Sequence, residues 1–400
     1  MPETQWLERS SPAFRLMIAT SRLAPDSWKK NQEEAIREAI EAAPDWSEYL
    51  RLVDRHRTPA LSLAALKRVP GIAIPELASQ ELQKRGDACR KQAIKHCLLL
   101  AQLLKAFNRA GIPVMSLKGP ILSDELYSDV GLRHSKDIDL AVAPGDLSRA
   151  QACLDTLGWH LDSTWFQLTP RQWESFFQNE HELQFVSPAG DSVLELHWRN
   201  EWDTPAQYSA CWARSISSIW QRCSYQAMDP IDQLLYLCNH GGFHAWFRAK
   251  WLGDLARIHA EGQVDWQAAL DRARNTGQEK PLLACLKLLQ VVHGLPLPSL
   301  EPDLWEKLRS FLLDSPLYEI GVSKDPDALG PREMLHTLLR LTRYTRLALP
   351  RKSWRESLSR FTYNRQDFKV LRLPDSLFWA YAPLHPILSA WRKIARIWGR

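Results

Sequence analysis

Two aspartates separated by one residue, Asp137 and Asp139, lie in an otherwise apolar run and constrain the fold more than any other feature. The alternation of residues 137–142 predicts a β-strand, with both aspartates on one face and Ile138 and Leu140 on the other. Two carboxylates about 7 Å apart on one strand face repel each other unless a cation lies between them. The pattern therefore favours a strand with a buried apolar face and a Mg²⁺ site on its polar face, because Mg²⁺ prefers oxygen ligands and accepts a substrate phosphate as well.

A second alternating segment offers the third carboxylate that such a site usually needs. Residues 192–198 predict a strand with Glu195 and His197 on one face and apolar side chains on the other. We interpret Glu195 as a metal ligand that also accepts a proton from the attacking group, with Glu182 and Asp191 as weaker substitutes. The alternatives are that Glu195 pairs with an arginine and that His197 is a hydrogen-bonded structural histidine.

The segment before the aspartates carries candidate phosphate contacts. Gly119 lies between a predicted strand, residues 113–117, and a short predicted helix, so a phosphate can approach its backbone and the free N–H groups of the helix. We expect Lys118, Gly119, Arg133 and Ser135 to contact the phosphates of a nucleotide. The alternatives are that Gly119 is a plain turn glycine and that Arg133 pairs with one of the acids.

The order of the predicted elements indicates an α+β fold. Strand, helix, strand, helix and hairpin follow one another, and segments with helical spacing lie on both sides of them. The predicted strands are 113–117, 137–142, 182–186 and 192–198, and the clearest helical segments are 31–42, 60–67, 90–109 and 230–289.

These elements predict a small mixed β-sheet core between helical additions. The predicted regions are an N-terminal helical region (1–92), the core (93–205), a helical domain that covers the site (206–330) and a basic, aromatic C-terminal helical region (331–400).

A histidine pair marks the predicted covering domain. His240 and His244 lie four residues apart and share a helix face, a spacing that also occurs in zinc sites, but neither a third ligand nor an H-E-x-x-H glutamate accompanies them. We treat His240, His244, Lys250 and Asp254 as candidate substrate contacts. For Lys250 and Asp254 the alternative is an ion pair on a helix surface, because they too are four residues apart.

Charge and cysteine content exclude several classes of protein. A net charge of +5 over 400 residues is mild; it suits anionic substrates, but it does not predict the clustered basic and aromatic surface that binds nucleic acid. Seven cysteines without a C-x-x-C pair indicate a reduced intracellular chain rather than a disulfide scaffold. The first residues lack the apolar segment of a secretory signal, so we expect a cytoplasmic protein.

The C-terminal region combines an apolar run with basic and aromatic residues. Residues 376–391 form the least charged run, which is too short to span a bilayer comfortably, and tryptophan, arginine and lysine follow it. One interpretation is peripheral contact with a membrane surface through this end. The other is a helix that packs on the protein and ends in a basic tail.

The segment Lys118-Gly119, Tyr127 and Arg133-His-Ser-Lys-Asp-Ile-Asp139-Leu resembles the DNA polymerase beta-like nucleotidyltransferase superfamily, whose signature is a glycine followed by D-x-D. It is most similar to a bacterial group of uncharacterised nucleotidyltransferase family proteins, and Glu195-Leu-His-Trp198 resembles the second block of that group. The group more often has aspartate at the position of Glu195, and the superfamily more often has Gly-Gly or Gly-Ser at the position of Lys118-Gly119.

The resemblance implies an enzyme that depends on Mg²⁺ or Mn²⁺. It would transfer a nucleoside monophosphate from an NTP to a hydroxyl and release pyrophosphate; the acceptor, whether a small molecule, a saccharide or a protein, is not implied. One alternative is a nucleotide-binding scaffold that lost turnover, although the presence of all three acids argues against it. The other is a toxin–antitoxin type nucleotidyltransferase that acts on protein or RNA, because abortive-infection toxins share the R-x-S-x-D spacing.

Overall fold

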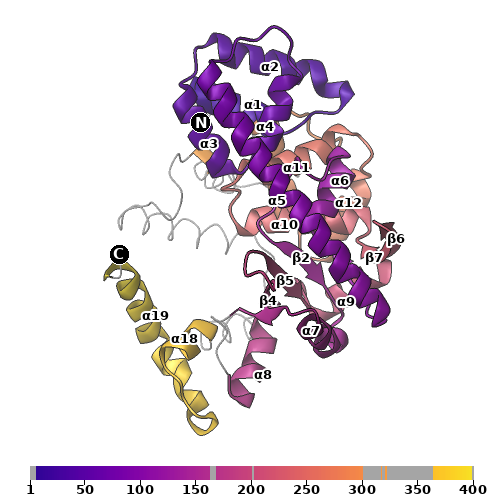
Figure 1. Cartoon of the computed structure of the whole chain (residues 1–400), viewed down its shortest axis with the longest axis vertical. Helices are drawn as coiled ribbons and strands as arrows, with labels where there is room; N and C mark the ends of the chain where they lie inside the picture. The colour runs from indigo at the N-terminus through magenta and orange to yellow at the C-terminus, as the bar shows by residue number, and fades with distance from the viewer. Residues whose placement is uncertain are drawn as a thin grey trace.

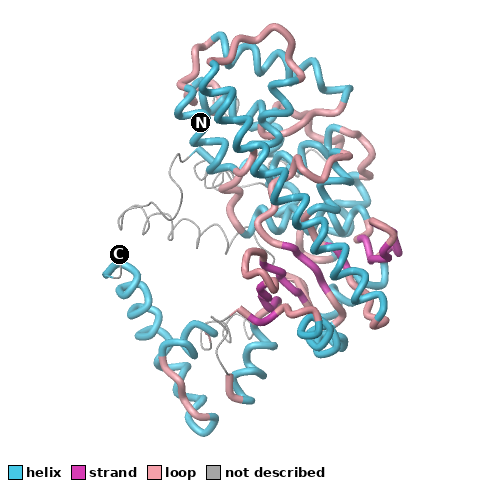
Figure 2. Tube along the Cα trace, viewed as in Figure 1, coloured by secondary structure: helices cyan, strands magenta, loops and turns pink. Residues whose placement is uncertain are grey.

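A seven-stranded mixed sheet lies in the middle of the chain's fold (magenta in Figure 2), with helices around it. The computed structural model describes residues 6–162, 168–200, 202–300, 317, 320–321 and 364–398. The strand order is β3-β4-β5-β2-β1-β7-β6, in which β2 with β5 and β1 with β7 are parallel and the other neighbours antiparallel. The strands are β1 (Met115–Ser116), β2 (Ile138–Ala141), β3 (His160–Leu161), β4 (Glu182–Val186), β5 (Val193–His197), β6 (Ile216–Trp220) and β7 (Cys223–Ala227).

The predicted α+β fold with a mixed sheet is confirmed. Each of the four predicted strands is present, β4 over the same residues and the others one or more residues shorter. The sheet also takes in the hairpin β6–β7, which lies beyond the predicted end of the core at residue 205, and pairs it with β1.

Alternation along the central strands separates two cores. Ile138, Leu140, Leu194 and Leu196 are almost fully buried in a cluster that includes the C-terminal half of α5 (Glu76–Arg109) and α7 (Leu147–Thr156). The opposite face presents Asp139 and Glu195 at the positions between these apolar residues. Because side chains alternate with period two, the same strands both anchor the sheet and display the acids.

Helix α5 runs through the molecule from the N-terminal helices to the sheet (Figure 1) and is 34 residues long. Leu82 and Cys89 belong to a core with α1 (Pro12–Thr20), α3 (Trp46–His56) and α4 (Pro59–Lys67), whereas Leu103 and Phe107 belong to the core beneath the sheet. The sequence predicted this helix only from residue 90. The helix stops, as predicted, at Gly111, whose φ of 62° suits glycine.

The region after the sheet consists of a helical layer that packs on the N-terminal helices. Close packing requires glycine at two positions: a Cβ at Gly241 would lie 2.2 Å from the Trp246 ring, and one at Gly253 would lie 2.6 Å from the Ser21 carbonyl oxygen. The helices of this layer are α10 (Pro230–Phe243), α11 (Ala249–Ala260), α12 (Trp266–Asn275) and α13 (Glu279–His293). Two helices outside this layer are α2 (Lys29–Glu41) and α6 (Pro120–Tyr127).

The C-terminal elements are α18 (Arg365–Val370), the short 3-10 helix η5 (Asp375–Ala380) and α19 (Tyr381–Trp398); η5 packs on α8 (Pro170–Asn179), and α19 runs away from α8, as Figure 1 shows in yellow and pink. Gln172 of α8 donates a hydrogen bond of 3.0 Å to the buried Tyr381 hydroxyl. The side chains of Trp379 and Trp391 are 64% and 61% exposed and are therefore accessible to a membrane surface. Membrane contact through this end stays a prediction. No helix in the described part of the chain is long and apolar enough to cross a membrane. Residues 331–363 of the predicted C-terminal region 331–400 lie outside the described residues.

Candidate active site

The polar face of the sheet brings together side chains from β2 and β5. Parallel pairing places Asp139 opposite Glu195 and Ala141 opposite His197. The ligand atoms of Asp139, Glu195 and His197 all lie within 4.8 Å of one another, and Asp139 is only 3% exposed. Two carboxylates and an imidazole at this separation form a group that can hold a divalent cation.

Strand β4 extends this group along the sheet. Antiparallel pairing with β5 places Gln184 opposite Glu195 and Glu182 opposite His197. Gln184 Nε2 donates to Glu195 Oε1 at 3.1 Å and to Glu182 Oε1 at 3.2 Å, so the amide fixes both carboxylates. His197 Nε2 lies 3.5 Å from Glu182 Oε2 and 3.8 Å from Asp139 Oδ1.

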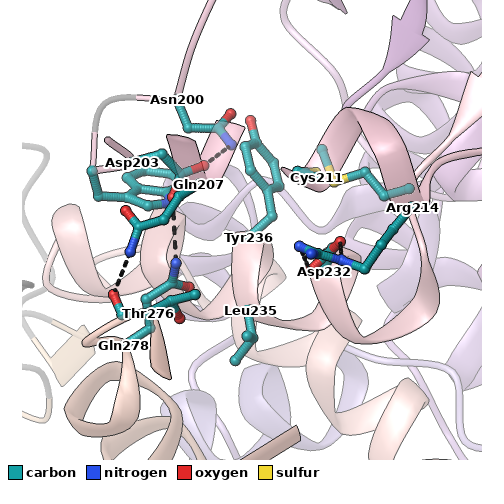
Figure 3. A pocket seen from close by; sticks show the side chains of 12 residues that line it. Asn200, Asp203, Gln207, Cys211, Arg214, Asp232, Leu235, Tyr236, Thr276 and Gln278 are labelled. Carbon is teal, nitrogen blue, oxygen red and sulfur yellow. Dashed lines mark hydrogen bonds and ion pairs between the residues drawn. The ribbon is translucent and has the colours of Figure 1, made fainter. Parts of the chain in front are cut away.

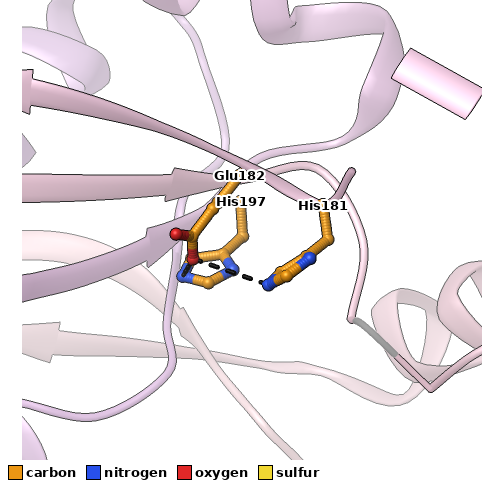
Figure 4. Close-up of side chains that lie close together, drawn as sticks. All are labelled: His181, Glu182 and His197. Carbon is orange, nitrogen blue, oxygen red and sulfur yellow. Dashed lines mark ion pairs between the residues drawn. The ribbon is translucent and has the colours of Figure 1, made fainter. Parts of the chain in front are cut away.

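A second group of three candidate metal ligands shares His197. Figure 4 shows the Glu182 carboxylate close to the rings of His181 and His197, and the ligand atoms of the three residues also lie within 4.8 Å of one another. These two groups are those that the described residues offer to a metal ion. Together they form a row of oxygen and nitrogen donors across β2, β5 and β4.

The acids of this row affect one another's ionisation strongly. Burial, followed by the charges of Asp139 and Glu182, raises the pKa of Glu195 far above its usual value. Burial also opposes ionisation of Asp139, but Lys118 and His197 beside it hold the pKa of Asp139 below its usual value. Asp137 lies just before β2, and its charge adds to the raised pKa of Glu195. The carboxylates therefore outnumber the positive charges next to them, which is the condition that favours binding of a cation.

Lys118 supplies the positive charge closest to the acids. Its Nζ lies 3.0 Å from Asp139 Oδ1 and 5.8 Å from the centre of the Tyr236 ring of α10. Burial disfavours the ammonium form, but Asp139 and Tyr236 raise the pKa of Lys118 above its usual value. Lys118 is thus a charged member of the site, between the sheet and the helical layer.

Gly119 follows in a backbone conformation that other residues rarely adopt. Its φ of 79° and ψ of −147° are essentially restricted to glycine, and a Cβ built there would meet nothing within 4 Å. The glycine caps the N-terminus of α6 without a side-chain hydrogen bond. The turn therefore leaves room in front of helix N–H groups, as an anion site requires.

Arg133 is brought to Asp254 rather than to the row of acids. Its Nε donates to Asp254 Oδ2 at 2.8 Å, and both side chains are almost fully buried. The Tyr127 hydroxyl donates to the other carboxylate oxygen at 3.4 Å. This geometry matches the alternative that the sequence left open, an ion pair between Arg133 and an acid.

The segment between Arg133 and the aspartates is held by two further hydrogen bonds. Lys250 Nζ donates to the His134 carbonyl oxygen at 3.1 Å, and Ser135 Oγ donates to the Asp137 carbonyl oxygen at 2.7 Å. Lys250 and Asp254 are both buried on α11 and bind this segment, so they do not form the surface pair considered above. Helix α11 therefore positions the loop that leads into β2.

His240 and His244 lie in an aromatic cluster. Their ring centres are 4.8 Å apart, the His244 ring stacks on Trp251 at 5.1 Å, and the His240 ring stacks on Tyr236 at 6.3 Å. Burial, followed by the charge of Lys118, lowers the pKa of His240 far below its usual value and that of His244 to about 4. Neither histidine belongs to a group of three candidate metal ligands among the described residues. Their contact with substrate stays a prediction.

Tyr236 also lines a small cavity of about 30 Å³ (Figure 3). Asn200 donates to Asp203 at 2.6 Å, Gln278 donates to the same carboxylate, and Arg214, which also lines the cavity, pairs with Asp232. These pairs make the lining of the cavity largely polar.

Several side chains of the site escaped sequence reasoning. Gln184 and His181 could have been found by counting pairs outward from the predicted hairpin loop, since antiparallel register follows from loop length. Tyr236 and the buried His96 of α5 gave no local signal, because the acids of the site are distant from them in sequence. Burial lowers the pKa of His96, and the charge of Asp137 opposes this shift.

Comparison with protein families matches residues 42–294 to the family described as uncharacterised nucleotidyltransferase. The match takes in helices α3, α4 and α5, the whole sheet and helices α10 to α13. Comparisons with curated proteins and with solved structures give no significant match. The match covers more than half of the chain and agrees with the mixed sheet that carries Asp139 and Glu195. The chain belongs to the uncharacterised nucleotidyltransferase family.

Proposed function

We propose that the chain transfers a nucleoside monophosphate from an NTP to a hydroxyl acceptor and releases pyrophosphate, in a reaction that depends on Mg²⁺ or Mn²⁺. The observation that carries this proposal is the convergence of Asp139, Glu195 and His197 within 4.8 Å, next to Lys118 and the Gly119 turn. Family membership supports a nucleotidyltransferase in general. The divalent metal ion, the NTP donor and the hydroxyl acceptor go beyond what family membership supports and are our proposal.

The residues present fit a divalent cation. Asp139 and Glu195 are proposed ligands, and His197 offers a nitrogen at the same place. Asp137, just before β2, is proposed as a further ligand, although it belongs to neither of the two groups of candidate ligands among the described residues. Burial and then the charge of Asp139 raise the pKa of Glu195, so the carboxylates are crowded, and a bound cation would offset their repulsion. When bound, the cation would polarise the phosphoryl oxygens and lower the pKa of the acceptor hydroxyl.

Residues of the chain would position the substrates. Lys118 would neutralise part of the triphosphate, and the space at Gly119 would admit phosphate oxygens to the N-terminus of α6. The acceptor oxygen would attack the α-phosphorus, its proton would pass to Glu195, and the bond from the α-phosphorus to pyrophosphate would break. Gln184 would orient Glu195 for this step through their hydrogen bond.

The other predicted site residues take supporting roles in this proposal. Arg133, Asp254 and Lys250 would hold the loop before β2, while Ser135 would fix the backbone at Asp137. His240 and His244 would form an aromatic wall beside Lys118 and contact the nucleotide as neutral rings.

A label-transfer experiment tests this function. The full chain would be incubated with each of the four NTPs labelled on the α-phosphorus, with Mg²⁺ or Mn²⁺ and cell extract. Asp139→Asn and Glu195→Gln should each lower transfer by about 10³-fold or more, since the transition state would lose much of its electrostatic stabilisation. Asp155→Asn, an exposed position on α7, should keep the full rate. An undiminished rate in Asp139→Asn would refute the assignment, and nucleotide binding without pyrophosphate release would favour the scaffold alternative.

A further inference from the structure

A cavity of about 260 Å³ lies among the N-terminal helices, outside the site described above. Its wall comes from α1, α2 and the C-terminal end of α13, and none of its lining residues belongs to the row of acids on the sheet. In Figure 1, α1 and α2 form the end of the molecule farthest from α7 and α8. Apolar side chains such as Ile18, Ala39 and Val292 make up much of the wall.

The unusual feature of this cavity is Arg22, which follows α1. Arg22 is only 5% exposed, yet its Nε and Nη1 are buried without a hydrogen-bond partner. Among the described residues, no carboxylate oxygen lies within 4.0 Å of its guanidinium. Burial lowers the pKa of Arg22 to about 10, and only the nearby Tyr127 opposes this. A buried cation without a counter-ion is costly, so its presence beside a cavity calls for an explanation.

Two more nitrogen-bearing side chains line the same cavity. Arg15 lies on α1, seven residues before Arg22, and its Nε is also buried without a partner. His293 ends α13, and its Nε2 is likewise without a partner. The acid in the wall is Glu38, which is exposed and makes no ion pair with Arg22. The buried part of the cavity is therefore lined by two guanidinium donors and an imidazole nitrogen, all without a partner.

The partial charge at the C-terminal end of α1 does not by itself explain how the buried charge of Arg22 is stabilised. The C-terminal end of α1 carries partial negative charge, which favours a nearby cation. The carbonyl groups there are already used, however, because Gln32 Nε2 donates to the Ala19 and Arg22 carbonyl oxygens. Gln32 Oε1 in turn accepts from the Ala24 backbone N–H at 2.9 Å, so this turn is fixed and its acceptors point away from the guanidinium.

We propose that this cavity binds a small amphiphilic anion, with a carboxylate or phosphate group at Arg22 and Arg15 and a short apolar body against Ile18 and Val292. The anion supplies the acceptors that the two guanidinium groups lack, and the apolar wall excludes water from the pair. The cavity, of about 260 Å³, has room for an anionic group and a chain of a few carbon atoms. The inference is independent of the reaction proposed for the row of acids.

Calorimetric titration of the full chain tests this site with three probes: hexanoate, hexyl phosphate and inorganic phosphate. Hexanoate or hexyl phosphate should bind the wild type at least tenfold more tightly than inorganic phosphate, because only they fill the apolar part. Arg22→Met should weaken the tighter probe at least tenfold. Lys30→Met, a solvated position on α2 that does not line the cavity, should bind like the wild type. The preference between hexanoate and hexyl phosphate tells which anionic group the site takes.

A second variant keeps the test decisive if Arg22→Met folds poorly. Ala35→Phe would fill the mouth of the cavity while leaving both arginines in place, and it should also abolish binding of the tighter probe. Without ligand, Arg22→Met should be at least as resistant to heat as the wild type, since it removes an unpaired buried charge. Equal affinity in wild type and Arg22→Met, or the absence of binding by all three probes to the wild type, would overturn the proposal.

Discussion

Lys118 and Asp139 form a buried ion pair at the centre of the candidate site, with 3.0 Å between Nζ and Oδ1. The lysine comes from the turn after β1 and the aspartate from the middle of β2, so the pair links the proposed phosphate turn to the proposed metal ligands. A single positive charge faces several acids there, which makes the pair sensitive both to substitution and to added cations.

Lys118→Met should therefore destabilise the chain by about 3–5 kcal/mol, because it leaves Asp139 buried without its counter-ion. Added Mn²⁺ should restore more of the free energy of unfolding in this variant than it adds to the wild type, since the cation would replace the lost charge. Urea unfolding with and without Mn²⁺ measures both effects. Lys105→Met, an exposed position on α5, serves as the control. Wild-type stability in Lys118→Met would show that the pair does not matter.

Arg133 and Asp254 should behave as a structural pair. Arg133→Met and Asp254→Leu should each cost about 3–5 kcal/mol, whereas the double variant should recover most of that loss because neither charge is left alone. Arg90→Met, which breaks the more exposed pair with Asp129, should cost about 1 kcal/mol or less. Urea unfolding of the four variants gives the coupling energy, and additive losses in the double variant would contradict the prediction.

Lys250 should make stability depend on pH. Burial, with Arg133 and Arg57 nearby, lowers the pKa of Lys250 from 10.5 to about 7. Between these two values the unfolded chain binds more protons at this site than the folded chain, so the free energy of unfolding rises with pH across that window. Below the folded-state pKa the ammonium is charged in both states, and the full cost of its burial is present.

Lys250→Met should remove this dependence. The variant should be more stable than the wild type below pH 7, and its advantage should shrink by about 2 kcal/mol between pH 7 and about pH 9. Urea unfolding at several pH values measures the difference, with Lys91→Met on the exposed face of α5 as the control. Parallel pH profiles for Lys250→Met and the wild type would contradict the lowered pKa.

His197 should influence which cation works best. Imidazole nitrogen binds Mn²⁺ better than Mg²⁺, which prefers oxygen ligands, so the proposed transfer should be faster with Mn²⁺ than with Mg²⁺ at equal concentration. His197→Asn should narrow the ratio of the two rates several-fold, and His160→Asn on the exposed strand β3 should not. An unchanged ratio in His197→Asn would place this histidine outside the cation's surroundings.

The local parts of the site could be predicted because each rests on alternation along one strand. Asp139 and Glu195 appeared on the polar faces of their strands, and Gly119 appeared between a strand and a helix. The sequence placed Glu195 beside the aspartates only because such a site usually needs a third acid. No local pattern indicates that β2 pairs with β5, because parallel pairing brings together residues that a long connection separates. Arg133 shows the same limit: Asp254 lies 121 residues further on, and no local pattern indicates that the two meet.

Two elements of secondary structure were not predicted because they too depend on tertiary packing. They are the N-terminal part of α5, before residue 90, and the hairpin β6–β7. The hairpin is exposed at Ile216 and Ile219 and gains its place from the edge of the sheet beside β1. Propensity alone rarely defines a short hairpin of this kind.

The length of α5 limits which insertions into this helix the fold can accept. Since each residue of a helix advances the rotation by about 100°, one residue inserted near the middle of α5 would turn the stripe that faces the sheet away from the stripe that faces the N-terminal helices. Insertion of seven residues, about two turns, would nearly restore the angle but push the two halves apart by about 10 Å. The helix thus sets a fixed rotational phase and a fixed spacing between the two cores, and its length should tolerate alteration far less than that of the loops.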